Sequence, residues 1–177
     1  LPHIIEKLGL LDGQVMISTN KVDQEELANL YNAVDFTINI SDAEGFGLAT
    51  LESLSCGTPI IVNMTGGLQE QITDGENWFG FGIEPVSKSV IGSLDVPYIY
   101  EDRIDQRDFS AALKKAMQVS PKAYKKMSIQ GRKHVTANYN FEKFEKEWIK
   151  TMDNIVEKHG SWDTRQGHRR WYLMEVA

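Results

Sequence analysis

Residues 36–62 read FTINISDAEGFGLATLESLSCGTPIIV, and this stretch decides the fold. The β-branched run over 36–40 predicts a strand. A glycine-containing loop follows it, and a helix then begins at about Leu48 and ends at Gly57. Ile60-Ile61-Val62 predicts the next strand. The order strand, helix, strand is the one that a parallel sheet with crossover helices requires.

Upstream of this stretch the chain alternates in the same way. Apolar residues over 4–8 predict a first helix, and Val15-Met16-Ile17 predicts a short strand. Asp23 followed by Glu26 is typical of a helix N-cap with its capping-box partner. The helix that follows has one apolar face, which we expect to be buried: Leu27, Leu30, Tyr31 and Val34.

Downstream, Gly66-Gly67 opens a short helical stretch that closes at Asp74-Gly75. Residues 78–108 have no clean periodicity, which indicates an irregular insertion with one or two short strands near Phe79 and Tyr98. Further helices are expected around Phe109, Leu113, Ala116 and Met117, and after the N-cap pair Ser120-Pro121. A last, long helix has an apolar stripe that needs a large surface to pack on: Phe141, Phe144, Trp148, Ile149, Met152, Ile155 and Val156.

These elements predict one α/β domain over residues 1–158, a Rossmann-like parallel sheet with flanking helices. A polar tail over 159–177 completes the chain. A chain of 177 residues with 41% hydrophobic and 25% charged residues is long enough for one proper core. The absence of an initiator Met suggests that the sequence is a fragment.

Charge and cysteine usage exclude several classes of protein. A net charge of -6 argues against a nucleic-acid partner, because nucleic-acid binders usually carry a basic face. The single cysteine, Cys56, cannot form an internal disulfide, and no His or Cys spacing predicts a metal site. We find no transmembrane segment and no cofactor motif. We therefore expect a cytoplasmic protein, with peripheral membrane association left open.

The loop between the strand and the helix indicates an anion site. Successive backbone N–H groups converge where this strand meets the N-terminus of the helix, and the helix dipole there is positive. Gly45 and Gly47 let the chain turn tightly and let a ligand approach the backbone. Glu44 and Glu52 bracket this pocket, and a carboxylate can accept two hydrogen bonds from a vicinal diol. The arrangement suits a diphosphate with sugar hydroxyls at one end and ribose hydroxyls at the other.

At these residues the chain resembles a known family. Glu44 and Glu52 with seven residues between them, the Cys56-Gly57-Thr58-Pro59 turn and Gly66-Gly67 resemble the C-terminal domain of family-four retaining glycosyltransferases of GT-B fold. The resemblance covers about 1–75. It implies a nucleotide diphospho-sugar donor, transfer of the sugar to a hydroxyl acceptor with retained anomeric configuration, and no divalent metal.

The resemblance also implies roles for individual residues. Glu44 would be the catalytic residue facing the transferred sugar, and Glu52 would bind the ribose. The base would lie near the loop 18–22. The expected donor-binding residues are Ser41, Gly45, Phe46, Gly47, Leu48, Thr50, Glu52, Gly66 and Gly67, with Lys21 as a candidate phosphate contact.

The chain departs from this family in two respects, and other functions stay open. It contains neither the basic pair that usually binds the diphosphate nor the acceptor-binding N-terminal domain. A non-catalytic nucleotide-sugar-binding or scaffolding module is therefore the alternative. A retaining glycoside hydrolase is a third possibility, although its carboxylates flank a glycosidic bond directly instead of bracketing an anion pocket.

Overall fold

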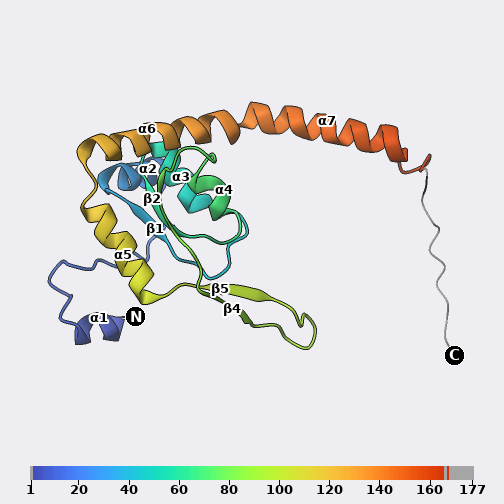
Figure 1. Cartoon of the computed structure of the whole chain (residues 1–177). Helices are drawn as coiled ribbons and strands as arrows, with labels where there is room; N and C mark the ends of the chain where they lie inside the picture. The colour runs from blue at the N-terminus through green and yellow to red at the C-terminus, as the bar shows by residue number, and fades with distance from the viewer. Residues whose placement is uncertain (1, 166, 168–177) are drawn as a thin grey trace.

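The computed structural model describes residues 2–165 and 167. At its centre is a parallel sheet of three strands in the order β1-β2-β3, formed by β1 (Thr37–Asn39), β2 (Ile60–Asn63) and β3 (Gly80–Ile83) (Figure 1). Ile38 of β1 pairs with Ile61 of β2, which pairs with Phe81 of β3. The predicted α/β fold with a parallel sheet and flanking helices is confirmed.

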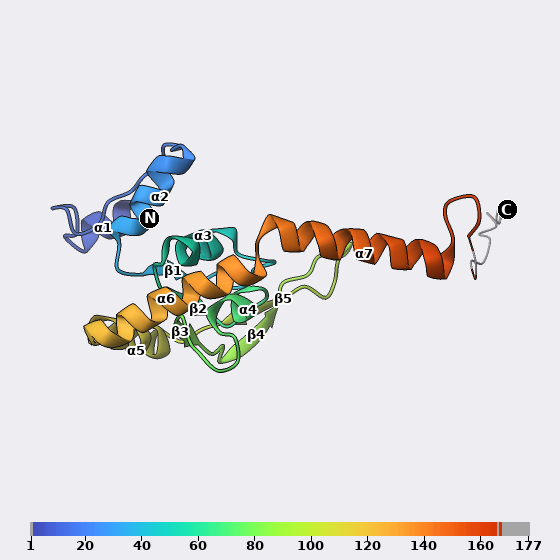
Figure 2. The ribbon, with the colours of Figure 1, turned by 90° about the horizontal axis from the view of Figure 1, so that it is seen from above.

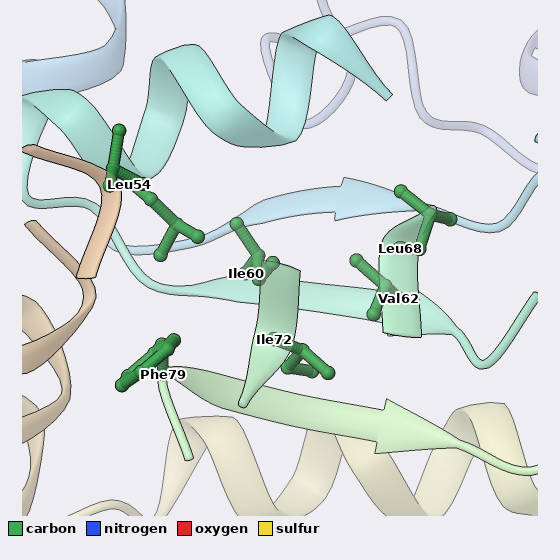
Figure 3. Packing of buried hydrophobic residues seen from close by; sticks show 7 residues of the cluster. Leu54, Ile60, Val62, Leu68, Ile72 and Phe79 are labelled. Atoms are coloured by element: carbon green, nitrogen blue, oxygen red, sulfur yellow. The ribbon is translucent and has the colours of Figure 1, made fainter. Parts of the chain in front are cut away.

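Helices cover both faces of this sheet. Their bounds are α1 Pro2–Lys7, α2 Gln24–Ala33, α3 Leu48–Cys56, α4 Leu68–Ile72, α5 Gln106–Met117, α6 Pro121–Asn138 and α7 Phe141–His159. On one face, α3, α4 and α6 enclose a core of seven buried residues (Figure 3): Leu54, Ile60, Val62, Leu68, Ile72, Phe79 and Val135. On the other face, α5 packs on the sheet through a second cluster: Ile61, Ile83, Ala112 and Ala116.

The central strand β2 supplies residues to both cores. All four of its residues are buried, as expected for a strand in a parallel sheet that is covered on both faces. Ile60 and Val62 point to one face and Ile61 to the other, because successive side chains of a strand alternate. Each such side chain contributes about 1.5–3 kcal/mol by leaving water.

The helix ends follow from local sequence. The Asp23 carboxylate accepts a hydrogen bond from the Glu26 N–H at 2.8 Å and begins α2. Gly57 ends α3 in the left-handed conformation at φ 87°. The Ser120 hydroxyl accepts from the Ala123 N–H at 3.3 Å before α6. These predicted caps are confirmed.

One strand prediction is wrong. Residues 15–17 form no strand: Val15, Met16 and Ile17 are 38%, 89% and 52% exposed. A β-branched run becomes a strand only when a neighbouring strand pairs with it, and the described part of the chain offers these residues none. The short strands expected near Phe79 and Tyr98 are found at Gly80–Ile83 and Tyr100–Arg103. The region 78–108 is nevertheless not an irregular insertion, because Gly80–Ile83 is β3 of the main sheet.

The rest of this region forms an antiparallel hairpin of β4 (Ser87–Val90) and β5 (Tyr100–Arg103). It projects from the edge of the domain near the start of α5 (Figure 1). β5 stays close to the main sheet, since the Asp102 N–H donates to the Asp42 carbonyl at 2.7 Å. The Asn63 side chain, at the end of β2, also donates to the Asp102 carbonyl at 3.3 Å.

Two apolar faces expected to be buried are exposed or only half-buried. In α2, which packs mainly along α3, Leu27 and Tyr31 are half-buried and Leu30 is 50% exposed. α7 has no buried residue and extends away from the domain (Figure 2). No helix in the described part of the chain is long and apolar enough to cross a membrane. Residues 166 and 168–177 of the predicted tail lie outside the described residues.

Candidate functional site

The candidate site lies at the carboxyl edge of the sheet. β1 ends at Asn39 and β2 at Asn63, so the loops that follow them meet at one edge of this parallel sheet. The Gly67 N–H donates to the Glu44 carbonyl at 3.4 Å and joins the two loops. The predicted position of Gly45 to Gly47 after the first of these strands is confirmed. Ligands of open α/β sheets bind at such an edge.

Helix α3 begins in this loop without a side-chain cap. Its N-cap residue Gly47 has φ 86°, a left-handed conformation that favours glycine. Within the described residues, neither a carbonyl nor a side chain accepts from the N–H groups of Leu48, Ala49 and Thr50. Free N–H groups at the positive end of a helix dipole attract an anion. This end of α3 is therefore suited to a phosphate group.

Glu44 lies in the loop before α3 and is half-buried. One of its carboxylate oxygens faces the Asn39 side-chain amide at 3.5 Å. The Asn39 oxygen in turn accepts from the Ser41 hydroxyl at 2.8 Å and from the Ser41 N–H at 3.1 Å. Asn39, at the end of β1, is thus bonded both to Ser41 at the start of the loop and to the Glu44 carboxylate.

Glu52 lies on the exposed side of α3 and its carboxylate has a different partner. The Tyr31 hydroxyl, from α2, donates to a Glu52 carboxylate oxygen at 3.0 Å. Burial, followed by the hydrogen bond and the charge of Glu52, raises the pKa of Tyr31 to about 12. The phenol therefore stays protonated at neutral pH and continues to donate to Glu52.

The side chains of Thr50 and Ser41 bind the protein itself. Thr50 is fully buried, and its hydroxyl donates to the Gly47 carbonyl at 2.7 Å. The Gln71 side chain, from α4, donates to the Phe46 carbonyl at 2.5 Å. Because the Ser41 hydroxyl is bonded to Asn39, both hydroxyls serve to position the loop. Thr50 was predicted to bind the nucleotide-sugar donor. Since its hydroxyl is already bonded within the protein, only its backbone N–H is free to bind a ligand.

Gly66 and Gly67 pack closely against the backbone of the loop that contains Glu44. A Cβ on Gly66 would lie 1.7 Å from the Glu44 carbonyl oxygen, and Gly66 has φ 48°. A Cβ on Gly67 would lie 2.7 Å from the backbone of Phe46. A Cβ on Gly45, in contrast, would meet no atom within 4 Å. Gly66 and Gly67 therefore let two backbones approach, whereas Gly45 leaves its outer side open.

Three predicted contact residues are exposed, two of them at this loop and the start of α3 and the third, Lys21, in the segment before α2. The Phe46 side chain is 41% exposed and packs edge-on against Tyr139, with ring centroids 5.8 Å apart. Leu48 is 66% exposed on the first turn of α3. Lys21 is exposed in the segment before α2, and none of the ion pairs found in the described structure includes it.

Several residues that shape the site were not predicted. The Asn63 side chain donates to the Ser41 carbonyl at 2.9 Å, and the Thr65 hydroxyl donates to the Asp102 carboxylate at 2.7 Å. Arg103 forms ion pairs with both Asp42 and Glu101. A polar residue at the end of an apolar strand was a usable signal for Asn63. The pairing of residues 42 and 103, sixty-one positions apart, has no local sequence signal.

Comparison with known families identifies the chain. The family described as "Glycosyl transferases group 1" matches residues 1–134. This chain belongs to that family. The matched region contains the whole sheet and the Glu44 loop and stops before α7.

Individual relatives agree with this assignment. D-inositol 3-phosphate glycosyltransferase 2 of Catenulispora acidiphila is 34% identical over 105 residues, which cover 58% of this chain and 24% of that protein. D-inositol 3-phosphate glycosyltransferase of Paenarthrobacter aurescens is 40% identical over 75 residues, which cover 42% of this chain and 18% of that protein. The chain therefore spans a quarter or less of the length of these curated relatives.

Solved structures agree with the fold. Sucrose-phosphate synthase from Thermosynechococcus elongatus superimposes with a TM-score of 0.68 at 23% identity, over 89% of this chain and 34% of that one. The C-terminal domain of a glycosyl transferase group 1 family protein from Francisella tularensis has a TM-score of 0.55 at 26% identity, over 79% of this chain and 60% of that one. The GT-B type of fold expected from the Glu44 to Glu52 region is confirmed.

Proposed function

We propose that this chain is the donor-binding half of a retaining glycosyltransferase that transfers a sugar from a nucleotide diphospho-sugar to a hydroxyl acceptor. The observation that carries this proposal is the uncapped start of α3, with Glu44 in the loop before it and Glu52 in its second turn. Carboxylates can accept from the hydroxyls of such a donor, and free N–H groups can bind its diphosphate.

Each end of the donor has a partner in this arrangement. The diphosphate would lie on the N–H groups of Leu48 and Ala49, with its sugar toward Glu44 and its ribose toward Glu52. The open outer side of Gly45 gives the ligand access to the backbone. As the bond to the anomeric carbon breaks, negative charge grows on the leaving diphosphate, and preorganised N–H donors stabilise that charge.

We further propose that the reaction needs no divalent metal. In a metal-dependent donor site, protein carboxylates coordinate an ion that lies beside the diphosphate of the donor. Here Asp42, an acid near the loop, is already paired with Arg103, so its charge is compensated by a protein cation. The names of the relatives, D-inositol 3-phosphate glycosyltransferases, support sugar transfer.

A transfer assay tests the proposal. The full-length protein, with its acceptor-binding half, should transfer sugar from an α-linked nucleotide donor and give an α-linked product, as measured by the anomeric proton coupling in NMR. A β-linked product would contradict the retaining mechanism. Donor binding without transfer to any hydroxyl acceptor would favour the alternative, a non-catalytic nucleotide-sugar-binding module.

A further inference from the structure

The side chain of Tyr31, from α2, contacts Glu52 of the candidate site. Its hydroxyl lies 3.0 Å from a carboxylate oxygen of Glu52, and in the described structure no other donor contacts that carboxylate. Glu52 is exposed and its side chain has three rotatable bonds, so without a partner the carboxylate would sample many positions. The hydrogen bond from Tyr31 restricts the Glu52 carboxylate to one position.

The position of Tyr31 is itself fixed. Its backbone carbonyl accepts a hydrogen bond at 2.7 Å from the hydroxyl of Thr58, which is only 3% exposed. The phenol is half-buried between α2 and α3. A rigid two-bond side chain anchored in this way loses little further entropy when it holds a partner.

The hydrogen-bonding capacity of the pair leaves room for a ligand. An ionised carboxylate has about four acceptor positions on two oxygens. Tyr31 occupies one position on one oxygen of Glu52, so the other oxygen and the remaining positions stay available. Two acceptor positions in a fixed plane are what the adjacent hydroxyls of a ribose require.

We propose that Tyr31 is a positioning residue for nucleoside recognition: through its hydroxyl it orients the Glu52 carboxylate toward the ribose hydroxyls of the donor. This inference rests on the proposed function, in which Glu52 binds the ribose. A purely structural role is the competing explanation, in which the same hydrogen bond only fastens α2 to α3.

A double-mutant cycle separates these explanations. Tyr31→Phe removes the hydroxyl and keeps the ring, and the Thr58 hydrogen bond survives because it uses the Tyr31 backbone. Calorimetric titrations with UDP, GDP and ADP first select the nucleotide that binds most tightly. Its affinity is then measured for the unaltered chain, Tyr31→Phe, Glu52→Ala and the double variant, and each is titrated again with the 2′-deoxy form of that nucleotide.

We expect Tyr31→Phe to weaken binding of the ribonucleotide by about three- to tenfold, the range of one lost hydrogen bond. In the Glu52→Ala background the same change should have no further effect, and it should have less effect on the 2′-deoxy nucleotide. Tyr124→Phe is the matched control, since Tyr124 is another half-buried tyrosine, packed on Phe36 on the other side of the domain. It should leave the affinity unchanged.

Each other result contradicts a specific claim. An equal loss from Tyr31→Phe with and without Glu52, or with both nucleotides, would show that Tyr31 acts only on the fold and would overturn the inference alone. Tight nucleotide binding that Glu52→Ala does not change would overturn the assignment of Glu52 to the ribose. Failure of the unaltered chain to bind UDP, GDP or ADP would overturn the proposed function and this inference with it.

Discussion

Gly45 and Gly66 are close in space, yet the same substitution should affect them in opposite ways. Gly66→Ala places a methyl group 1.7 Å from the Glu44 carbonyl oxygen at a residue with positive φ. We expect it to lower the free energy of unfolding by about 2 kcal/mol or more in chemical denaturation. Gly45→Ala meets no protein atom and should change that free energy by less than about 0.5 kcal/mol.

Although Gly45→Ala should leave stability almost unchanged, it should weaken binding of the sugar donor. A methyl group on its open side fills space that the ligand needs, so Gly45→Ala should weaken binding of the sugar donor by about tenfold in calorimetry. Full donor affinity in a stable Gly45→Ala chain would contradict the proposed approach of the ligand to this backbone.

The two glutamates should differ in which part of the donor they bind. Hydrogen bonds to a charged group are worth about 1.5–3 kcal/mol, so Glu52→Ala should weaken binding of the nucleoside diphosphate by about tenfold or more. Glu44→Ala should change that affinity by only about a few-fold. In the full-length enzyme Glu44→Ala should lower turnover by about a hundredfold or more, the scale of a lost transition-state contact. Equal losses of nucleotide affinity in both variants would contradict this assignment.

The residue types in the sequence predicted the position of the candidate site. They did not predict the contacts that each side chain makes there. The glycines and Glu44 of the loop, and Glu52 on α3, are visible in sequence because tight turns and sugar-binding sites need such residues. The burial of the Thr50 hydroxyl was not predictable, since it depends on Gln71 from α4 and on the packing of α3 against it. Tyr31 was predicted only as part of an apolar face, because its phenol can serve either packing or hydrogen bonding.

At the scale of elements, the β4–β5 hairpin fastens the loop that contains Glu44. Arg103 of β5 pairs with Asp42 in that loop and with Glu101. Arg103→Gln removes the shared cation and leaves two like charges together, so the loop should loosen. We expect faster amide hydrogen exchange at residues 41–44 and about a three- to tenfold weaker affinity for the sugar donor.

The matched control for this prediction is Arg107→Gln. Arg107 pairs with Asp105 at 3.1 Å at the exposed start of α5, away from the loop. Exposed pairs contribute about 0–1 kcal/mol, so neither variant should unfold the domain. Unchanged exchange at residues 41–44 in Arg103→Gln would show that the ion pairs of Arg103 do not hold the loop in place.

Elements with strong local signals were predicted together with their place in the sheet, whereas the short strands near Phe79 and Tyr98 were expected only as parts of an irregular insertion. Residues 36–40 and 60–62 are β-branched runs beside clear helix caps, and both became strands. The third strand, Gly80–Ile83, contains two glycines, which are unfavourable in strands. A Cβ on Gly80 would lie 1.7 Å from the Ile60 carbonyl oxygen, so a close approach of β2 determines this strand. That contact has no local sequence signal.

At the scale of the whole molecule, α7 stands apart from the domain. It has no buried residue, although Phe144 and Trp148 stack on its surface with ring centroids 6.1 Å apart. Ending the chain after Asn140 should therefore change the free energy of unfolding of the domain by less than about 1 kcal/mol. Thermal and chemical denaturation of the shortened chain measure this. Loss of cooperative unfolding would show that α7 is part of the core.

The central claim is that this domain binds a nucleotide diphospho-sugar at the Glu44 loop without a metal. Calorimetric titration of the chain with UDP-glucose, GDP-mannose and ADP-glucose, each in excess EDTA and again with Mg²⁺, tests it most directly. We predict that at least one donor binds in EDTA and that Mg²⁺ changes its affinity by less than about threefold. Binding that appears only with Mg²⁺, or no binding of any donor, would contradict the claim.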